Sequence, residues 1–134
     1  MKTILLIDSN SNILENFTEY LEMEGFIILA ANRGTKAVEI AREFMPDLII
    51  CEILMNEMDG YEVLRLLLNT SKTSGIPFIF CTTKCEKIDR QVALKLGADD
   101  YIVKPISMEL LCKKAKRWSK TGSKRYITPE NILL

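Results

Sequence analysis

Six polar residues that suit the binding of a phosphoryl group or a metal ion each follow closely on a short apolar run. They are two carboxylates, three hydroxyls and one ammonium group: Asp8, Ser9, Glu52, Thr82, Thr83 and Lys104. Lysine and hydroxyl groups donate hydrogen bonds to phosphoryl oxygens, and paired carboxylates are ligands that Mg²⁺ prefers. One acid of this kind, taken alone, is usually a helix cap. The combination on four separate runs predicts one shared polar pocket.

The apolar runs have the length and composition of strands that are covered on both faces. Each is short, rich in branched residues and barely alternating. They are Thr3–Ile7, Phe26–Ala30, Leu48–Cys51, Pro77–Cys81 and Tyr101–Val103. We expect these five segments to be the strands that position the pocket.

Amphipathic segments lie between the runs and predict five helices. One face of each is apolar at helical spacing: Ile13, Phe17 and Leu21; Ala37, Ile40, Ala41 and Phe44; Val63, Leu64 and Leu67; Ile88, Val92 and Leu96; and, facing inward, Leu110, Leu111, Ala115 and Trp118. Gly25 and Gly97 are expected to close two of these helices, and Asp59 and Ser107 to cap two others. Alternating strands and helices predict an α/β fold with a doubly wound parallel sheet. In such folds the site lies at the carboxyl ends of the strands.

Composition narrows the classes of protein further. The 134 residues are 48% hydrophobic and 27% charged, which is typical of one globular domain. No apolar run approaches 18 residues and no signal peptide is evident, so we expect a cytoplasmic protein without a membrane span. The absence of histidine excludes serine–histidine triads and histidine acid–base catalysis. The four cysteines include no C-x-x-C pair, so a zinc site has little support.

Charge is distributed unevenly along the chain. Up to Cys112 there are 11 basic and 17 acidic residues, whereas the remainder has 7 basic and 1 acidic. A basic segment that includes Trp118 and Tyr126 is one pattern of nucleic-acid contact. A solvated terminal helix with a basic tail is the interpretation that we favour, so nucleic acid is not an expected partner. We therefore expect a domain over residues 1–118 and a basic tail over 119–134.

Five stretches of the sequence resemble one known family. Residues 4–8 (ILLID), 47–52 (DLIICE), 58–62 (MDGYE), 82–84 (TTK) and 97–105 (GADDYIVKP) are similar in order and spacing to the receiver domain of bacterial two-component response regulators. The resemblance covers about residues 1–118. It implies a flavodoxin-like (βα)5 fold with the strand order 2-1-3-4-5.

The resemblance also implies roles for particular residues. Receivers accept a phosphoryl group from a histidine kinase on an aspartate at the end of the third strand, with Mg²⁺ bound beside it. Lys104 and Thr82 match the positions that bind the phosphoryl oxygens, and Tyr101 matches the aromatic switch that turns inward. Asp8 matches one metal ligand and Leu54 the backbone carbonyl that is another. The Lys104–Pro105 bond is expected to be cis.

Four departures from the family pattern fall on or beside this chemistry. Glu52 stands at the phosphoacceptor position, and Ser9 replaces the second acid of the metal-binding pair. Thr83 replaces a small residue and Asn56 replaces a loop proline. The extra methylene of glutamate moves its oxygens outward, and displacements on that scale cost about 100-fold in rate. We expect no enzymatic activity, little phosphorylation of Glu52 and weak or lost Mg²⁺ binding at Asp8, Glu52 and Leu54.

These departures leave several functions open. In the favoured hypothesis this is an atypical receiver and interaction module, in which Glu52 pairs with Lys104 and biases Tyr101 inward. The alternatives are a degenerate site, a conventional phospho-accepting receiver, and a flavodoxin-like cofactor-binding protein. The last is weak because no glycine-rich loop follows the first strand. Expected partners are a histidine kinase or a downstream effector, and a homodimer through the fourth helix, fifth strand and fifth helix is a further expectation.

Overall fold

Strands and helices alternate throughout residues 1–126, the part of the chain that a computed structural model describes. The strands are β1 (Thr3–Ile7), β2 (Ile27–Ala31), β3 (Leu48–Cys51), β4 (Phe78–Thr82) and β5 (Asp100–Val103). The helices are α1 (Ser11–Met23), α2 (Gly34–Phe44), α3 (Gly60–Leu68), α4 (Lys87–Leu96) and α5 (Met108–Thr121). A short 3-10 helix, η1 (Lys124–Tyr126), follows α5. The predicted order of elements is confirmed.

All neighbouring strands pair in parallel, in the order β2-β1-β3-β4-β5. This confirms the predicted α/β fold and strand order. Three strands differ from their predicted limits by one residue. β2 starts at Ile27 because the amide of Phe26 donates to the carbonyl of Leu21 and so completes the end of α1. β4 is Phe78–Thr82 instead of the predicted Pro77–Cys81, and β5 is Asp100–Val103 instead of Tyr101–Val103.

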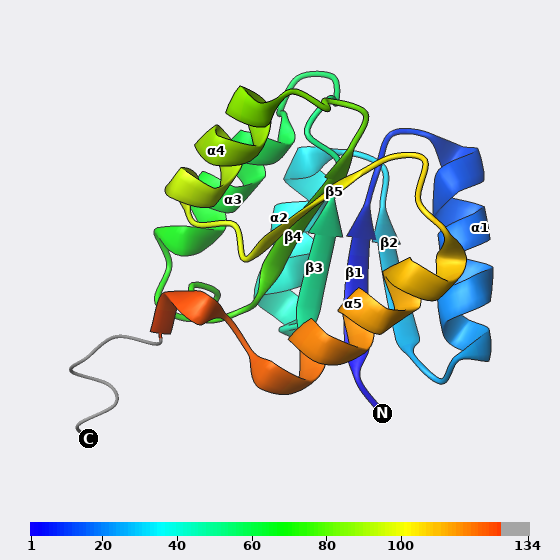
Figure 1. Cartoon of the computed structure of the whole chain (residues 1–134). Helices are drawn as coiled ribbons and strands as arrows, with labels where there is room; N and C mark the ends of the chain where they lie inside the picture. Colours follow the sequence, from blue (N-terminus) through cyan, green and yellow to red (C-terminus); the bar gives the residue numbers. More distant parts are fainter. Residues whose placement is uncertain (127–134) are drawn as a thin grey trace.

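Helices cover both faces of the sheet, with α1 and α5 on one face and α2, α3 and α4 on the other (Figure 1). Each strand contributes alternate residues to two separate cores. On β1, Leu5 and Ile7 belong to the core under α2 and α3, whereas Ile4 and Leu6 belong to the core under α1 and α5. All four side chains are at most 2% exposed. The sheet is therefore buried on both sides, which explains the nearly continuous apolar character of its strands.

The predicted helix ends are confirmed in their main features. The Asp59 and Ser107 side chains accept hydrogen bonds from the backbone amides of Glu62 and Leu110, at the starts of α3 and α5. Gly97 ends α4 with φ +117°, a left-handed conformation that favours glycine. Asn10 caps α1 by accepting from two backbone amides, which the sequence analysis did not predict.

The predicted inward face of α5 is wrong in part, and the apolar series of α4 does not face the core. Leu110 is 45% exposed, because the buried side of α5 is centred on Leu111, Cys112, Ala115 and Trp118. On α4 the only buried residue is Ala93. Its apolar series Ile88, Val92 and Leu96 is 40–58% exposed. The spacing identified α4 as a helix, but the side that the helix presents to the core is a different one.

The end of the described chain packs against the domain. Helix α5 continues to Thr121, and Ser123 and Arg125 then contact the buried Asp99. The predicted boundary between residues 118 and 119 stays a prediction, and residues 127–134 of the predicted tail lie outside the described part. Within residues 1–126 no helix is long and apolar enough to cross a membrane.

Candidate functional site

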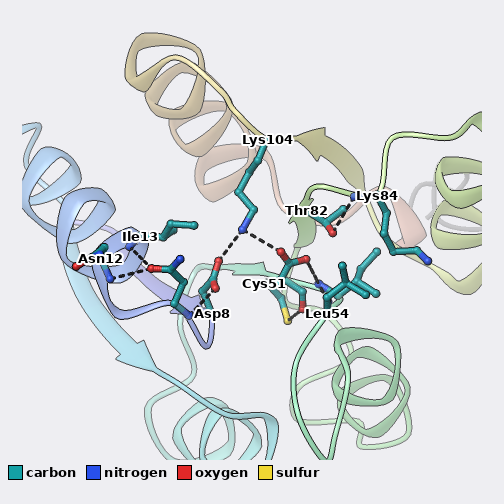
Figure 2. Close-up of polar contacts among 11 residues, drawn as sticks. Asp8, Asn12, Ile13, Cys51, Leu54, Thr82, Lys84 and Lys104 are labelled. Carbon is teal, nitrogen blue, oxygen red and sulfur yellow. Dashed lines mark hydrogen bonds and ion pairs between the residues drawn. The ribbon is translucent and has the colours of Figure 1, made fainter.

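Three charged side chains meet at the carboxyl end of the sheet, and two of them, Asp8 and Lys104, are labelled in Figure 2. Asp8 follows β1, Glu52 follows β3 and Lys104 follows β5. The Lys104 Nζ atom lies 2.9 Å from Asp8 Oδ2 and 2.9 Å from Glu52 Oε1. All three side chains are at most 10% exposed. The structure thus brings the predicted acids together around a single cation.

The local backbone holds the Glu52 carboxylate in place. Glu52 Oε2 accepts hydrogen bonds from the backbone amides of Ile53, at 2.6 Å, and Leu54, at 3.2 Å. Gly60, at the start of α3, approaches closely, and a Cβ atom there would lie 2.4 Å from the Glu52 carbonyl oxygen. Glycine at position 60 therefore lets the loop fold back over β3. This loop geometry presents the two amides to Glu52.

Asp8 completes the cluster from the other side. Its Oδ1 accepts from the backbone amide of Asn10 at 2.9 Å, while its Oδ2 pairs with Lys104. All four carboxylate oxygens of Asp8 and Glu52 therefore have a partner. Burial works to lower the pKa of Lys104, but hydrogen bonds to Asp8 and Glu52 outweigh it and raise that pKa above its ordinary value. Lys104 is thus an ammonium ion at neutral pH.

Hydrogen bonds connect this cluster to Tyr101. The backbone amide of Lys104 donates to the Thr82 carbonyl at 2.8 Å. Thr82 Oγ1 in turn accepts from the Lys84 amide at 3.3 Å. The Tyr101 hydroxyl donates to the Lys84 carbonyl at 2.7 Å. The path therefore runs from the Lys104 backbone through the end of β4 to the tyrosine hydroxyl.

Tyr101 is turned into the protein. The residue is 3% exposed, and its ring packs edge-on against Phe80 with centroids 6.4 Å apart. Burial, Tyr61 and the carboxylates of Asp89 and Glu52 raise the pKa of Tyr101 to about 12. A buried, hydrogen-bonded phenol with this pKa is uncharged over the physiological pH range. The structure therefore places Tyr101 inward, and its role as a switch stays a prediction.

The residues expected to bind a metal ion fit one poorly. The Lys104 ammonium lies between the two carboxylates, where a cation would otherwise sit. Ser9 supplies a hydroxyl where a third acid would be needed, and it is solvent-exposed. Among residues 1–126 no group of three or more His, Cys, Asp or Glu side chains could hold a metal ion. The ligand roles of Asp8, Glu52 and Leu54 stay predictions.

Other features of the site were not predicted. The hydrogen bond from Tyr101 to the Lys84 carbonyl could not be predicted, because a backbone acceptor leaves no signature in the sequence. A partly apolar groove also opens beside Lys104, lined by Ile13, Phe17, Thr83, Lys104, Pro105 and Ile106. Its α1 side was detectable, since Ile13 and Phe17 belong to a predicted apolar series. The Lys104–Pro105 bond is cis, as expected.

Comparison with known sequences matches most of this chain to one domain family. A family model described as the response regulator receiver domain matches residues 4–116. The chain is 34% identical over 113 residues to protein PilH of Pseudomonas aeruginosa, a match that covers 84% of this chain and 93% of PilH. It is 29% identical over 132 residues to the transcriptional regulatory protein CreB of Escherichia coli, which covers 98% of this chain and 56% of CreB. The chain thus spans about half the length of several curated relatives.

Solved structures show the same fold over most of the chain. The signal receiver domain of a histidine kinase from Syntrophus aciditrophicus superimposes with a TM-score of 0.81 at 33% identity, covering 89% of this chain and 90% of that one. The receiver domain of the sensor histidine kinase PA1611 from Pseudomonas aeruginosa gives 0.82 at 25% identity, covering 90% and 98%. The latter was solved with a magnesium ion coordinated in its active-site cleft.

Proposed function

Because the chain belongs to the response regulator receiver domain family and is thus a receiver of two-component signal transduction, we propose that it signals without being phosphorylated. The proposal rests on one observation: Lys104 Nζ forms an ion pair with Glu52 Oε1, and the two atoms are 2.9 Å apart. In this proposal the domain is an atypical receiver and an interaction module rather than an enzyme. Glu52 forms an ion pair with Lys104, the lysine that would otherwise bind a phosphoryl oxygen.

Glu52 is a poor phosphoryl acceptor in this arrangement. Transfer depends on positioning and on electrostatic stabilisation, and it needs a carboxylate oxygen aligned with the phosphorus atom. One Glu52 oxygen pairs with Lys104 and the other accepts two backbone amides. These contacts fix the orientation of the carboxylate, so attack would have to occur in that orientation or break one of them. The geometry therefore supports little or no modification of Glu52.

Magnesium binding is expected to be weak for a related reason. The magnesium-bound receiver of PA1611 makes Mg²⁺ the natural ion to consider for this family. Here the ligands would be Asp8, Glu52 and the Leu54 carbonyl. The ion would have to displace the Lys104 ammonium, and Ser9 offers no compensating charge. We propose that Mg²⁺ binds weakly, if at all, under ordinary conditions.

In this proposal the same pair maintains an output state without a phosphoryl group. Glu52 holds Lys104, the Lys104 amide bonds to Thr82, and the Lys84 carbonyl receives the Tyr101 hydroxyl. Each contact favours the inward position of Tyr101. We infer that Glu52 acts as a built-in partial substitute for the phosphorylated aspartate.

The partners of such a module are signalling proteins. The groove beside Lys104 offers a histidine kinase or another upstream protein an apolar contact. On the surface formed by α4, β5 and α5, the exposed basic residues include Lys87, Arg90, Lys113 and Arg117. Asp99 and Asp100 at the start of β5 are buried. This basic surface suits a downstream effector with acidic side chains.

The remaining expectations about partners stay part of the proposal. A homodimer through α4, β5 and α5 is less favoured than an acidic effector, because two copies of a basic surface repel each other. Nucleic acid is not a proposed partner. Trp118, which the sequence suggested as a contact residue, is 3% exposed and packs in the core under α5. We propose a cytoplasmic location without membrane attachment.

Phosphorylation can be tested with a small phosphodonor. The native protein is incubated with acetyl phosphate and Mg²⁺, and the intact chain is examined by mass spectrometry. The expected result is no phosphoryl adduct on the native protein and an adduct on a Glu52→Asp, Ser9→Asp variant. Glu57→Asp, at an exposed position of the same loop, serves as the control. A phosphoryl adduct on Glu52 of the native protein would overturn the proposal and indicate a conventional receiver.

A further inference from the structure

The segment that follows α5 places an arginine beneath the end of α4. Gly122 ends α5 with φ +78°, in the region that favours glycine, and the chain then turns along the amino edge of the sheet. Figure 1 shows η1 below α3 and α4 and away from the body of α5. The side chain of Arg125 lies at this edge and is only 18% exposed. An arginine buried to this extent needs acceptors for its N–H groups.

Four acceptors surround the two terminal nitrogens of Arg125. Nη1 donates to the carbonyl of Gly97 at 2.6 Å and to Asp99 Oδ2 at 2.9 Å. Nη2 donates to the carbonyls of Ser74, at 3.0 Å, and Ile76, at 2.6 Å. Each of these nitrogens carries two hydrogens, so four donors have four acceptors. The acceptors come from the end of α4, the residue before β5 and the loop before β4.

Other contacts hold these acceptors in place. Asp99 Oδ2 also accepts from the backbone amide of Phe78 at 2.9 Å, at the start of β4. The loop before β4 is fixed by Thr73, whose buried hydroxyl donates to the Leu67 carbonyl at 2.6 Å. These contacts involve no atom of Arg125. We therefore expect the acceptors to keep their positions when the arginine side chain is absent.

The arrangement suits a guanidinium group and not an ammonium group. A guanidinium presents its N–H bonds as a planar fork, whereas a lysine ammonium has three N–H bonds on a single atom and cannot reach four separated acceptors. The Nε atom of Arg125 is buried and has no hydrogen-bond partner among residues 1–126. Recognition therefore rests on the two terminal nitrogens, which every alkylguanidinium shares.

We propose that these four acceptors form a guanidinium-binding site, that Arg125 occupies it in cis, and that its occupation holds the end of α4 against the loop before β4. The short connection from α5 gives Arg125 a high effective concentration at the site, in the millimolar range for tethers of this kind. A guanidinium compound in solution therefore gains a free site only when the Arg125 side chain is removed. The proposal does not depend on Glu52 or on phosphorylation.

Helix α4 has few other attachments to the domain. Its one buried residue is Ala93, and Arg90 donates to the Tyr101 carbonyl at 3.0 Å. Both residues precede Gly97, whose carbonyl is the group that Arg125 contacts at the end of the helix. The guanidinium connects this carbonyl to two carbonyls of the loop before β4. The last turn of α4 should therefore depend on Arg125 more strongly than the rest of the domain does.

Chemical rescue of Arg125→Ala tests the site. The substitution leaves buried acceptors unpaired, so the midpoint of thermal unfolding should fall by about 5 °C or more. N-ethylguanidinium chloride reproduces the end of the arginine side chain. At tens of millimolar it should raise the midpoint of the variant by about 1–3 °C, increasing with concentration, and should not raise that of the native protein. N-ethylammonium chloride at equal concentration, which matches the charge and the ionic strength, should not raise either midpoint.

Arg42→Ala is the matched control, because Arg42 is an exposed arginine on α2. This variant should melt as the native protein does and should gain nothing from either salt. If Arg125→Ala does not fold alone, recovery of its fold in N-ethylguanidinium and not in N-ethylammonium is the expected result. A native midpoint in Arg125→Ala, equal recovery in the two salts, or no recovery in N-ethylguanidinium would each overturn the proposal.

Hydrogen exchange followed by mass spectrometry tests the effect on α4. In Arg125→Ala the amides in the last turn of α4 should exchange faster than in the native protein. The increase should be about tenfold larger than that in α1, which lies on the other face of the sheet. N-ethylguanidinium should reverse the difference. Equal acceleration in α1 and α4 would overturn the proposed role of the site in holding the end of α4.

Discussion

Two buried ion-pair clusters lie at opposite ends of the sheet, and they differ in the kind of group that completes each one. At the carboxyl end, Lys104 pairs with two acids, Asp8 and Glu52, from other strand ends. At the amino end, Arg125 pairs with one acid, Asp99, at 2.9 Å. The Asp99 side chain is fully buried and that of Arg125 is 18% exposed. The first cluster has an excess negative charge, whereas the second is neutral.

Backbone groups dominate the amino-end cluster. Asp99 accepts hydrogen bonds from the amides of Phe78 and Lys124, from Ser123 Oγ and from Arg125. The Arg125 guanidinium also donates to the carbonyls of Gly97, Ser74 and Ile76. These contacts tie the segment after α5 to the loop before β4 and to the end of α4. The arrangement joins chain segments that are far apart in the sequence.

The comparison separates a structural cluster from a functional one. A cation that satisfies backbone carbonyls cannot be released without leaving buried polar groups unpaired. Lys104 instead pairs with two carboxylates from the loops of the site, so it keeps one charge partner when the other is withdrawn. We therefore expect the amino-end cluster to contribute more to folding, and the carboxyl-end cluster to determine the state of Tyr101.

The largest predicted effect follows from removing the acid of the amino-end cluster. Asp99→Ala leaves Arg125 without its charge partner and the Phe78 amide without an acceptor. Breaking a buried pair in this way costs about 3–5 kcal/mol. The free energy of unfolding, measured by urea denaturation, should fall by that amount.

Glu39→Ala is a suitable control for this experiment. Glu39 pairs with Lys36 at 3.6 Å, but its side chain is 72% exposed. Exposed pairs contribute about 0–1 kcal/mol, so the control should be close to native. Equal losses in the two variants would contradict the structural role of the amino-end cluster.

A smaller loss of stability is predicted for a substitution in the cluster at the carboxyl end of the sheet. Lys104→Met removes the cation and leaves Asp8 and Glu52 facing each other. The loss in unfolding free energy should be about 1–3 kcal/mol at neutral pH, because Asp8 and Glu52 keep their hydrogen bonds from backbone amides after the lysine is removed. A loss larger than that of Asp99→Ala would reverse the proposed division between the two clusters.

The Lys104 contribution should also depend on pH. The pKa of Lys104 is raised above its ordinary value of 10.5, so its folded state holds the proton more tightly than the unfolded state does. The contribution is therefore complete below pH 10.5 and is lost as the pH rises through the folded pKa. Urea midpoints of the native and Lys104→Met proteins should converge in alkaline solution. A constant difference across that range would contradict the ion pair.

Only one of the two clusters could be predicted from the sequence. Asp8, Glu52 and Lys104 each follow a recognisable strand, and parallel strands bring their carboxyl ends to one edge of the sheet. Arg125 follows no periodic segment and is one of seven basic residues after Cys112. Its partners are mostly backbone carbonyls, which leave no trace in the side-chain pattern. The contact is therefore set by tertiary structure alone.

The side of α4 that faces the core could not be predicted from the sequence either. The spacing of Ile88, Val92 and Leu96 correctly indicated a helix, because periodicity reports the repeat of the backbone. It does not report which side faces the core when a helix packs near the edge of a sheet. At such positions an apolar series can face outward, as it does here.

The link from Glu52 to Tyr101 is the central claim, and titration of Tyr101 tests it most directly. The ¹³Cζ resonance of labelled tyrosine, assigned with a Tyr101→Phe variant, is followed with pH in the native protein and in Glu52→Ala. The native Tyr101 should titrate at about 12 because it is buried. In Glu52→Ala it should titrate nearer the ordinary value of 10.0, because the ring turns outward and the Glu52 charge that raises the pKa of Tyr101 is removed. A Tyr101 that titrates at the same high pH in both proteins would contradict the claim that Glu52 keeps it inward.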